Sequence, residues 1–272
     1  MRFLKKQLKW NGNFMIFNLF ATPTITMINK ETTARGLCFC FCASMFSLCP
    51  AQAASLRISP VNIEMQASQK ATSLSLTNSG TEAVNLQLRA FSWSQQNGQD
   101  RLTATSELMI SPPAVTVPAG ASYTVRVART AVTPAPSELS YRLLIDELPK
   151  PVDPRTINPG ISMILRTSLP VFVVDDKAFA QLVWRTWQDA DGIHTEVQNI
   201  GKRHAKISQL TLSVDNASIS FGKGLNGYVL AGTSRQFTAG QPNARVKLAK
   251  GKSVTLRAND GYLPIEETLH AQ

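Results

Sequence analysis

The chain has 272 residues, and its 28 lysines and arginines against 18 aspartates and glutamates give a net charge of +10 at neutral pH. It has no dense basic block interleaved with aromatic residues. The nearest group, Lys202, Arg203 and Lys206, is expected to lie on a solvated turn, so nucleic acid is excluded as an expected partner.

The amino-terminal segment has the features of a secretory signal. An apolar stretch at 37–49, too short to span a bilayer, precedes Ala51-Gln52-Ala53. We expect residues 1–53 to be removed, which leaves about 219 residues with 22 basic and 17 acidic side chains and a net charge of +5. The long lead before the apolar stretch favours Met27 as the translation start.

All four cysteines lie between residues 38 and 49, within this segment. The exported chain is therefore expected to have no disulfide and no cysteine metal ligand. No other stretch reaches membrane-spanning length, which predicts a soluble protein without stable membrane insertion.

Short segments that alternate between apolar and polar residues follow the signal and predict β-strands. The first group lies at 56–65, 71–78, 83–93, 121–130, 139–148 and 161–174. After the polar break at 175–177, further strands are expected at 180–187, 193–199, 205–214, 228–231, 244–248 and 253–258. The spacing predicts an all-β protein with a β-sandwich domain at 54–174 and a smaller β-domain at 175–272.

Residues 141–174 are the most distinctive part of the chain. Two apolar runs, YRLLIDELP and ISMILRTSLPVFVV, flank a loop whose prolines forbid a helix, so they form separate strands. In the second run the apolar side chains alternate onto one face of the strand: Ile161, Met163, Leu165, Leu169, Val171 and Val173. This ridge is long enough to serve more than one core, so the strand could complete the sheet of another protein.

Motifs for catalysis or cofactor binding are weak. His194, His204 and His270 have no ligand-type neighbours at metal-binding spacing, and we expect surface or turn histidines. Residues 222–227 match G-x-G-x-x-G, but a strand-like segment follows where a dinucleotide site needs a helix, which favours a glycine-rich hairpin or bulge.

Pairs of carboxylates are equally weak as catalytic signals. Asp146 and Glu147 should point to opposite faces of a strand, and Glu266 and Glu267 fall in the carboxyl-terminal tail. We therefore expect no enzyme, no metal and no cofactor.

Together these features resemble the periplasmic pilus chaperones of chaperone–usher systems over essentially the whole exported chain. The chain is especially similar to the archaic branch typified by the Csu pilus chaperone, in LRISPVNIEM at 56–65, LPVF at 169–172 and GYVLAG at 227–232. The resemblance implies two immunoglobulin-like domains at an angle with a cleft between them. It also implies a non-enzymatic periplasmic protein that binds pilus subunits by donor-strand complementation and delivers them to an outer-membrane usher.

The resemblance assigns the donor side chains to Ile161, Met163 and Leu165, which would enter pockets of the subunit. The alternative is that these three residues only line the core of their own domain.

Better-known members of the family bind the terminal carboxylate of the subunit with an Arg on the first strand and a Lys late in the donor strand. That late position is Pro170 here. Because the planar guanidinium suits buried carboxylates, Arg89 is our first candidate anchor and Arg166 our second. Arg57 and Arg142 are weaker candidates, and a solvated strand face is the alternative for each arginine.

A secreted β-sandwich protein that binds sugar or another surface ligand is the alternative function. Its binding loops would include Trp184 and Trp187 as exposed aromatic residues. Neighbouring genes for an usher and small pilins would favour the chaperone.

Overall fold

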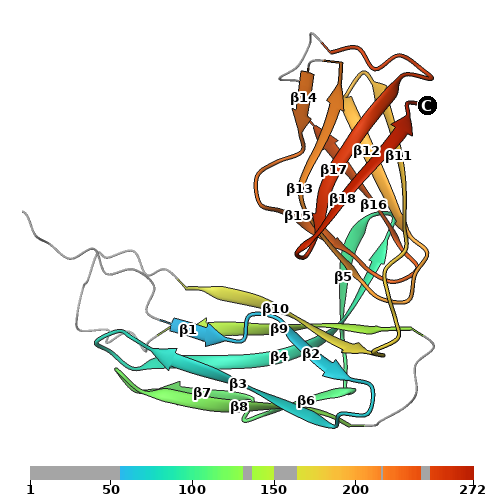
Figure 1. The fold of residues 1–272 in the computed structure, drawn as a ribbon. Coiled ribbons are helices and arrows are strands. Elements are labelled where there is room, and N and C mark those ends of the chain that lie inside the picture. The colour runs from blue at the N-terminus through green and yellow to red at the C-terminus, as the bar shows by residue number, and fades with distance from the viewer. Residues whose placement is uncertain (1–55, 131–136, 150–163, 216, 240–245) are drawn as a thin grey trace, which may run out of the picture. The chain divides into compact units, whose positions relative to one another are not determined.

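The computed structural model describes residues 56–130, 137–149, 164–215, 217–239 and 246–272, and every regular element within these ranges is a β-strand (Figure 1). The all-β prediction is therefore confirmed. No helix in this described part is long and apolar enough to cross a membrane.

The strands up to Val174 form two sheets. One has the order β1 (Leu56–Ser59), β3 (Ala71–Asn78), β8 (Ser122–Arg129) and β6 (Leu108–Ser111). The other, called the β10 sheet below, has the order β2 (Ile63–Gln66), β10 (Arg166–Val174), β9 (Leu139–Leu148), β4 (Val84–Gln96) and β5 (Gln99–Ala104), with β7 (Ala114–Val117) paired to β4.

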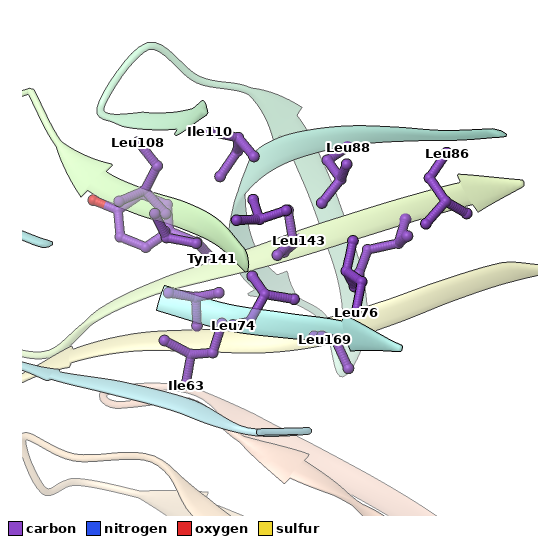
Figure 2. Packing of buried hydrophobic residues seen from close by; sticks show 14 of the residues in the cluster. Ile63, Leu74, Leu76, Leu86, Leu88, Leu108, Ile110, Tyr141, Leu143 and Leu169 are labelled. Atoms are coloured by element: carbon purple, nitrogen blue, oxygen red, sulfur yellow. The ribbon is translucent and has the colours of Figure 1, made fainter. Parts of the chain in front are cut away.

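These two sheets enclose the first apolar core. Leu74 and Leu76 of β3 lie among Leu86, Leu143 and other leucines of the β10 sheet (Figure 2). The alternation of each strand sends these side chains inward, and each fully buried leucine contributes about 1.5–3 kcal/mol relative to exposure.

Tyr141 closes one end of the first core and keeps its polar atom paired. Its hydroxyl donates to the Glu107 carboxylate at 2.7 Å. Burial raises the pKa of the Tyr141 hydroxyl above its ordinary value, so the side chain is neutral at physiological pH.

The later strands form two further sheets around a second core. One has the order β11 (Leu182–Asp189), β12 (Gly192–Asn199) and β16 (Ser234–Ala239). The other has the order β14 (Ala217–Ser220), β13 (Ala205–Val214), β17 (Ser253–Asp260) and β18 (Leu263–His270), with β15 (Leu225–Val229) paired to β13. Val197, Leu212 and Leu256 are among the fully buried residues between them.

Two expectations for the second half are wrong. Glu266 and Glu267 lie in β18, not in a tail. Residues 246–248 belong to no strand, because the N–H of Leu248 donates to the side chain of Gln188 at 2.7 Å instead of to a ladder partner. The apolar alternation there reflects burial against the second core.

The glycine-rich segment is not a hairpin, because β14 and β15 both pair with β13 and not with each other, but the register of β15 on β13 shifts between Ile207 and Ser208, as in the expected bulge. Gly222 and Gly224 have φ angles of 120° and 77°, which non-glycine residues rarely adopt. β15 begins at Leu225, directly after them, so no helix follows to receive a pyrophosphate.

Candidate functional site

One face of β10 changes its environment along the strand. Leu169, Val171 and Val173 are at most 4% exposed and belong to the first core. Leu165 has the same parity but is 42% exposed, and Ile164 beside it is 54% exposed. The predicted ridge is therefore present in its described part, and the molecule's own core ends at Leu169.

Ile161 and Met163, the other two predicted donor residues, lie outside the described residues. The pairing of β10 with β9 extends beyond the end of the strand to Leu165, whose carbonyl accepts from the N–H of Glu147 at 2.9 Å. Leu165 is therefore held in an extended conformation while its side chain lies in solvent.

β10 has a neighbouring strand on one side along nearly its whole length, but on the other side only at its end. β9 pairs with residues 166–173, whereas β2 pairs in parallel only with residues 171–174. No described strand pairs with residues 166–170 on the side of β2. We call residues 166–170 the open edge.

Backbone groups of the open edge point away from β9 at alternate residues. The Val174 carbonyl accepts from the N–H of Ala67 at 2.8 Å on the side of β2. By alternation, the backbone groups of Arg166, Ser168 and Pro170 face the same side. Pro170 has no N–H, and here it costs no ladder bond, as is usual for proline on an edge. Such an edge can accept a strand from another chain.

The two arginines predicted as anchors converge on one carboxylate. Arg89 Nη2 donates to Asp146 Oδ2 at 2.6 Å, and Arg166 Nε donates to Asp146 Oδ1. Arg166 lies directly opposite Asp146 in the ladder, so their side chains share one face of the β10 sheet. We call these three residues the arginine–aspartate cluster.

The cluster is charged and partly accessible to solvent. The Asp146 side chain is 11% exposed, while those of Arg89 and Arg166 are 44% and 62% exposed. Hydrogen bonds from Arg166 and Arg89 hold the pKa of Asp146 below its ordinary value, so the cluster carries a net charge of about +1 at neutral pH. Each guanidinium keeps N–H groups that Asp146 does not use.

The two weaker anchor candidates have different surroundings. Arg57 is exposed on β1, in the other sheet from the cluster. Arg142 is partly buried on β9, with its guanidinium carbon 3.7 Å from the centroid of the Trp93 ring. The sequence could have suggested that Arg142 and Asp146 share a face, because they lie four residues apart on one strand.

Aromatic residues surround the end of the β10 sheet. Trp93, Phe172 and Val174 from the first half of the chain form a buried cluster with Tyr228 and Leu230 from the second half. Sequence reasoning missed this cluster, because its members are far apart in the chain and give no local pattern.

His194 and His204 are buried, so the expectation of surface or turn histidines is wrong for both. His204 Nδ1 lies 2.7 Å from a Glu138 oxygen, and His194 Nε2 lies 2.7 Å from an Asp189 oxygen. Each partner satisfies one ring nitrogen of its histidine and so favours burial. His270 is exposed, as expected.

Trp184 is also placed differently from the expectation for a sugar-binding protein. Its side chain is buried in the second core, so it offers no exposed aromatic surface. Trp187 is partly buried, and its ring stacks on that of His194 with the centroids 5.2 Å apart. Trp184 therefore gives no support to the alternative function of sugar binding.

The two pairs of sheets define the class of proteins built from immunoglobulin-like β-sandwiches. Residues 55–177 match the family model described as pili and flagellar-assembly chaperone, PapD N-terminal domain. This part of the chain is thus similar to the amino-terminal domain of the pilus-assembly chaperones. No curated protein matches the chain in sequence.

Solved structures of chaperones share the fold. The CsuC–CsuE chaperone–tip adhesion subunit pre-assembly complex of the archaic Csu pili of Acinetobacter baumannii matches with 24% identity and a TM-score of 0.62, covering 80% of this chain and 100% of that one. The Pseudomonas aeruginosa CupB2 chaperone matches with 16% identity, a TM-score of 0.53 and coverages of 79% and 100%. The Salmonella enterica SafA pilin–SafB chaperone complex matches with 12% identity and a TM-score of 0.55, covering 80% of this chain and 98% of that one. The expected fold of two immunoglobulin-like sandwiches is confirmed.

Proposed function

We propose that this protein is a non-enzymatic periplasmic chaperone that stabilises pilus subunits by donor-strand complementation and delivers them to an outer-membrane usher. One observation carries the proposal: the open edge of β10 continues into the exposed Leu165, on the face that is buried further along the strand. Unpaired backbone groups beside apolar side chains are what strand addition requires. The relatives solved as chaperone–subunit complexes support it.

Donation of this strand would protect a subunit whose own sheet is incomplete. Such a subunit exposes apolar core and unpaired backbone groups, which favour aggregation. Ile161, Met163 and Leu165 would fill its groove, and the flexible thioether of Met163 suits pockets of varied shape. Nothing in this mechanism needs a cofactor, and the described residues hold no group of three side chains suited to a metal ion.

The arginine–aspartate cluster is proposed to bind a subunit carboxylate. Its Arg89 and Arg166 point to the same face and keep unused N–H donors, while Asp146 fixes their positions. A carboxylate held by two guanidiniums gains charge-assisted hydrogen bonds, which are about twice as strong as neutral ones.

The export and domain boundaries belong to the same proposal. Removal of residues 1–53 would release a chain whose first domain covers 54–174 and whose second covers 175–272. The gap between the end of β10 at Val174 and the start of β11 at Leu182 supports this division. Mass spectrometry of the periplasmic protein should give Ala54 as its first residue.

Co-expression with a pilin encoded beside the chaperone gene tests the function. Met163→Asp should abolish capture of the pilin, because an unpaired charge in an apolar pocket costs several kcal/mol. Ser162→Asp, of opposite parity, is the matched control and should weaken capture less. Pull-downs from periplasm measure capture of the pilin, and thermal melts show whether the free chaperone variants remain folded. A folded Met163→Asp variant that still captures pilin would exclude donation in this register.

A further inference from the structure

β18 lies at the edge of its sheet and has one free side. β17 is its only ladder neighbour among the described strands. The N–H of Ala271 donates to the Lys252 carbonyl at 2.9 Å on the side of β17. By alternation, the backbone groups of Glu266, Thr268 and His270 face away from β17. A strand from another chain can pair with such groups.

The face of β18 toward the second core is apolar at all but one of its central positions. Ile265 and Leu269 are partly buried against that core. Glu267 lies between them with the same parity, directly opposite the fully buried Leu256 of β17. No hydrogen bond or ion pair joins its carboxylate to another residue in the described part of the chain. Burial raises the pKa of the Glu267 carboxyl above its ordinary value.

The strands beside Glu267 offer it no opposite charge. Two described strands, β17 and β11, pack against β18. On the face toward the second core they present only side chains that do not ionise: Val254, Leu256 and Ala258 of β17, and Trp184 and Thr186 of β11. Arg257, Glu266 and His270 point to the other face, where Arg257 Nη2 donates to Glu266 Oε1 at 2.8 Å.

Two copies of β18 fit each other antiparallel when the twofold axis passes through Glu267. Ile265 of one copy then lies opposite Leu269 of the other, and Glu266 exchanges backbone hydrogen bonds with Thr268. The central pair is formed by the two Glu267 residues and is of the non-hydrogen-bonded kind, in which side chains approach most closely. Ionised, these carboxylates repel each other. A shift by two residues places Glu267 opposite Ile265 or Leu269, where its charge would be desolvated without a partner.

We propose that β18 is a pairing edge for a second copy of this chain, blocked while Glu267 is ionised and available when this carboxyl is neutral. Pairing would join the two β18 strands in one continuous sheet and cover Ile265 and Leu269. In its ionised form Glu267 is an inward-pointing charge, which is a common means by which edge strands avoid pairing. The inference goes beyond the proposed function and does not depend on strand donation by β10.

Sedimentation equilibrium of the exported chain at pH 7 tests the inference. Glu267→Gln removes the charge with little change of shape and should strengthen self-association about tenfold or more. Glu266→Gln, of opposite parity, is the matched control and should associate no more than the wild type. Adding Thr268→Pro to Glu267→Gln removes an N–H on the free side of β18 and should restore the monomer. Lowering the pH from 7 to 5 should strengthen association of the wild type but not of Glu267→Gln.

Cysteine cross-linking tests the register, because all four native cysteines lie in the segment expected to be removed. Glu267→Cys, at the central pair, should form a disulfide between two copies under mild oxidation. Leu263→Cys has the same parity but lies four residues from the axis, so it should cross-link much more slowly.

The outcomes are separate from those for the proposed function. A Glu267→Gln variant that is folded in thermal melts and remains monomeric would overturn the inference. A dimer that persists with Thr268→Pro would show that the contact lies elsewhere. Met163→Asp should associate as the wild type does, so a failure of strand donation leaves this result unchanged.

Discussion

At the scale of single residues, Asp146 determines how positive charge is presented on the β10 sheet. Without it, Arg89 and Arg166 would repel each other and would sample many rotamers. With it, each guanidinium is fixed by a hydrogen bond from one side. The carboxylate therefore positions both guanidiniums, which would lower the entropy cost of the carboxylate binding proposed above.

The charge of Asp146 leads to a prediction about pH. Because its pKa is lower in the folded chain, its contribution to stability is present above its unfolded pKa of about 4 and is lost as the pH falls through the folded value. Asp146→Asn should lower the free energy of unfolding at pH 7 by about 1 kcal/mol, since solvent screens the half-exposed arginines. The deficit should shrink below pH 4.

Urea unfolding at pH 7, 4 and 2.5 measures this effect. Asp176→Asn, at an exposed position, is the control and should match the wild type at each pH. A deficit that grows as the pH falls would contradict the assigned sign.

The sequence could identify Arg89 and Arg166 as candidates from their residue type and their place on predicted strands. It could not show that they meet, because their convergence on Asp146 depends on the register of β4, β9 and β10. One residue of slip in any of these pairs would move an arginine to the opposite face. The position of Arg142 beside Pro170 is likewise a property of the ladder, which residue type alone does not reveal.

At the scale of elements, β10 serves two purposes within one alternating pattern. Leu169 is buried in the first core, whereas Leu165, which lies four residues earlier and has the same parity, is exposed. The pattern alone predicts that both belong to an apolar face. The distinction between core and binding surface depends on where the neighbouring strands end.

This division predicts opposite effects for two alanine substitutions. Leu169→Ala should lower the free energy of unfolding by about 2–5 kcal/mol, as for other buried leucines. Leu165→Ala should change it by less than about 0.5 kcal/mol and should weaken pilin capture. Chemical denaturation and pull-downs of the two variants measure both effects. A large loss of stability for Leu165→Ala would place its side chain in the molecule's own core.

Two of the strands that sequence reasoning missed lack buried side chains, whereas a third, β6, was missed although it buries Leu108 and Ile110. β5 is exposed at every residue, and β18 has no buried residue, so neither shows the apolar alternation on which prediction depends. In contrast, β3 and β9 bury alternate side chains in the first core, and their predicted ranges agree with the structure. Edge strands are specified by backbone pairing, which leaves little trace in residue type.

At the scale of the whole molecule, polar and aromatic contacts join the two halves of the described chain. Gln95 Nε2 donates to the Tyr228 carbonyl at 2.8 Å, and its Oε1 accepts from the N–H of Leu230 at 3.0 Å. Arg203 donates to Glu64 at 2.6 Å, so this residue has a partner and is not merely solvated surface. Phe172 also stacks on His204 with the ring centroids 3.6 Å apart.

These contacts predict coupled unfolding of the two halves. Tyr228→Ala removes the ring that touches Trp93, Phe172 and His204, so the halves should unfold independently in the variant. Scanning calorimetry should show one transition for the wild type and two for Tyr228→Ala. Tyr262→Ala, at a fully exposed tyrosine, is the control and should retain one transition. A single transition in both variants would show that the aromatic cluster does not couple the halves.

The position of β2 has a consequence for fidelity in pairing. Side chains repeat every two residues along a strand, so a partner that slides by two positions presents the same faces and keeps its ladder bonds. Apolar matching alone therefore discriminates poorly between such registers. Because β2 closes the edge at Val171, sliding in one direction produces a steric clash. The short parallel strand β2 thus gives the periodic edge of β10 one fixed boundary, which limits the registers that a bound chain can adopt.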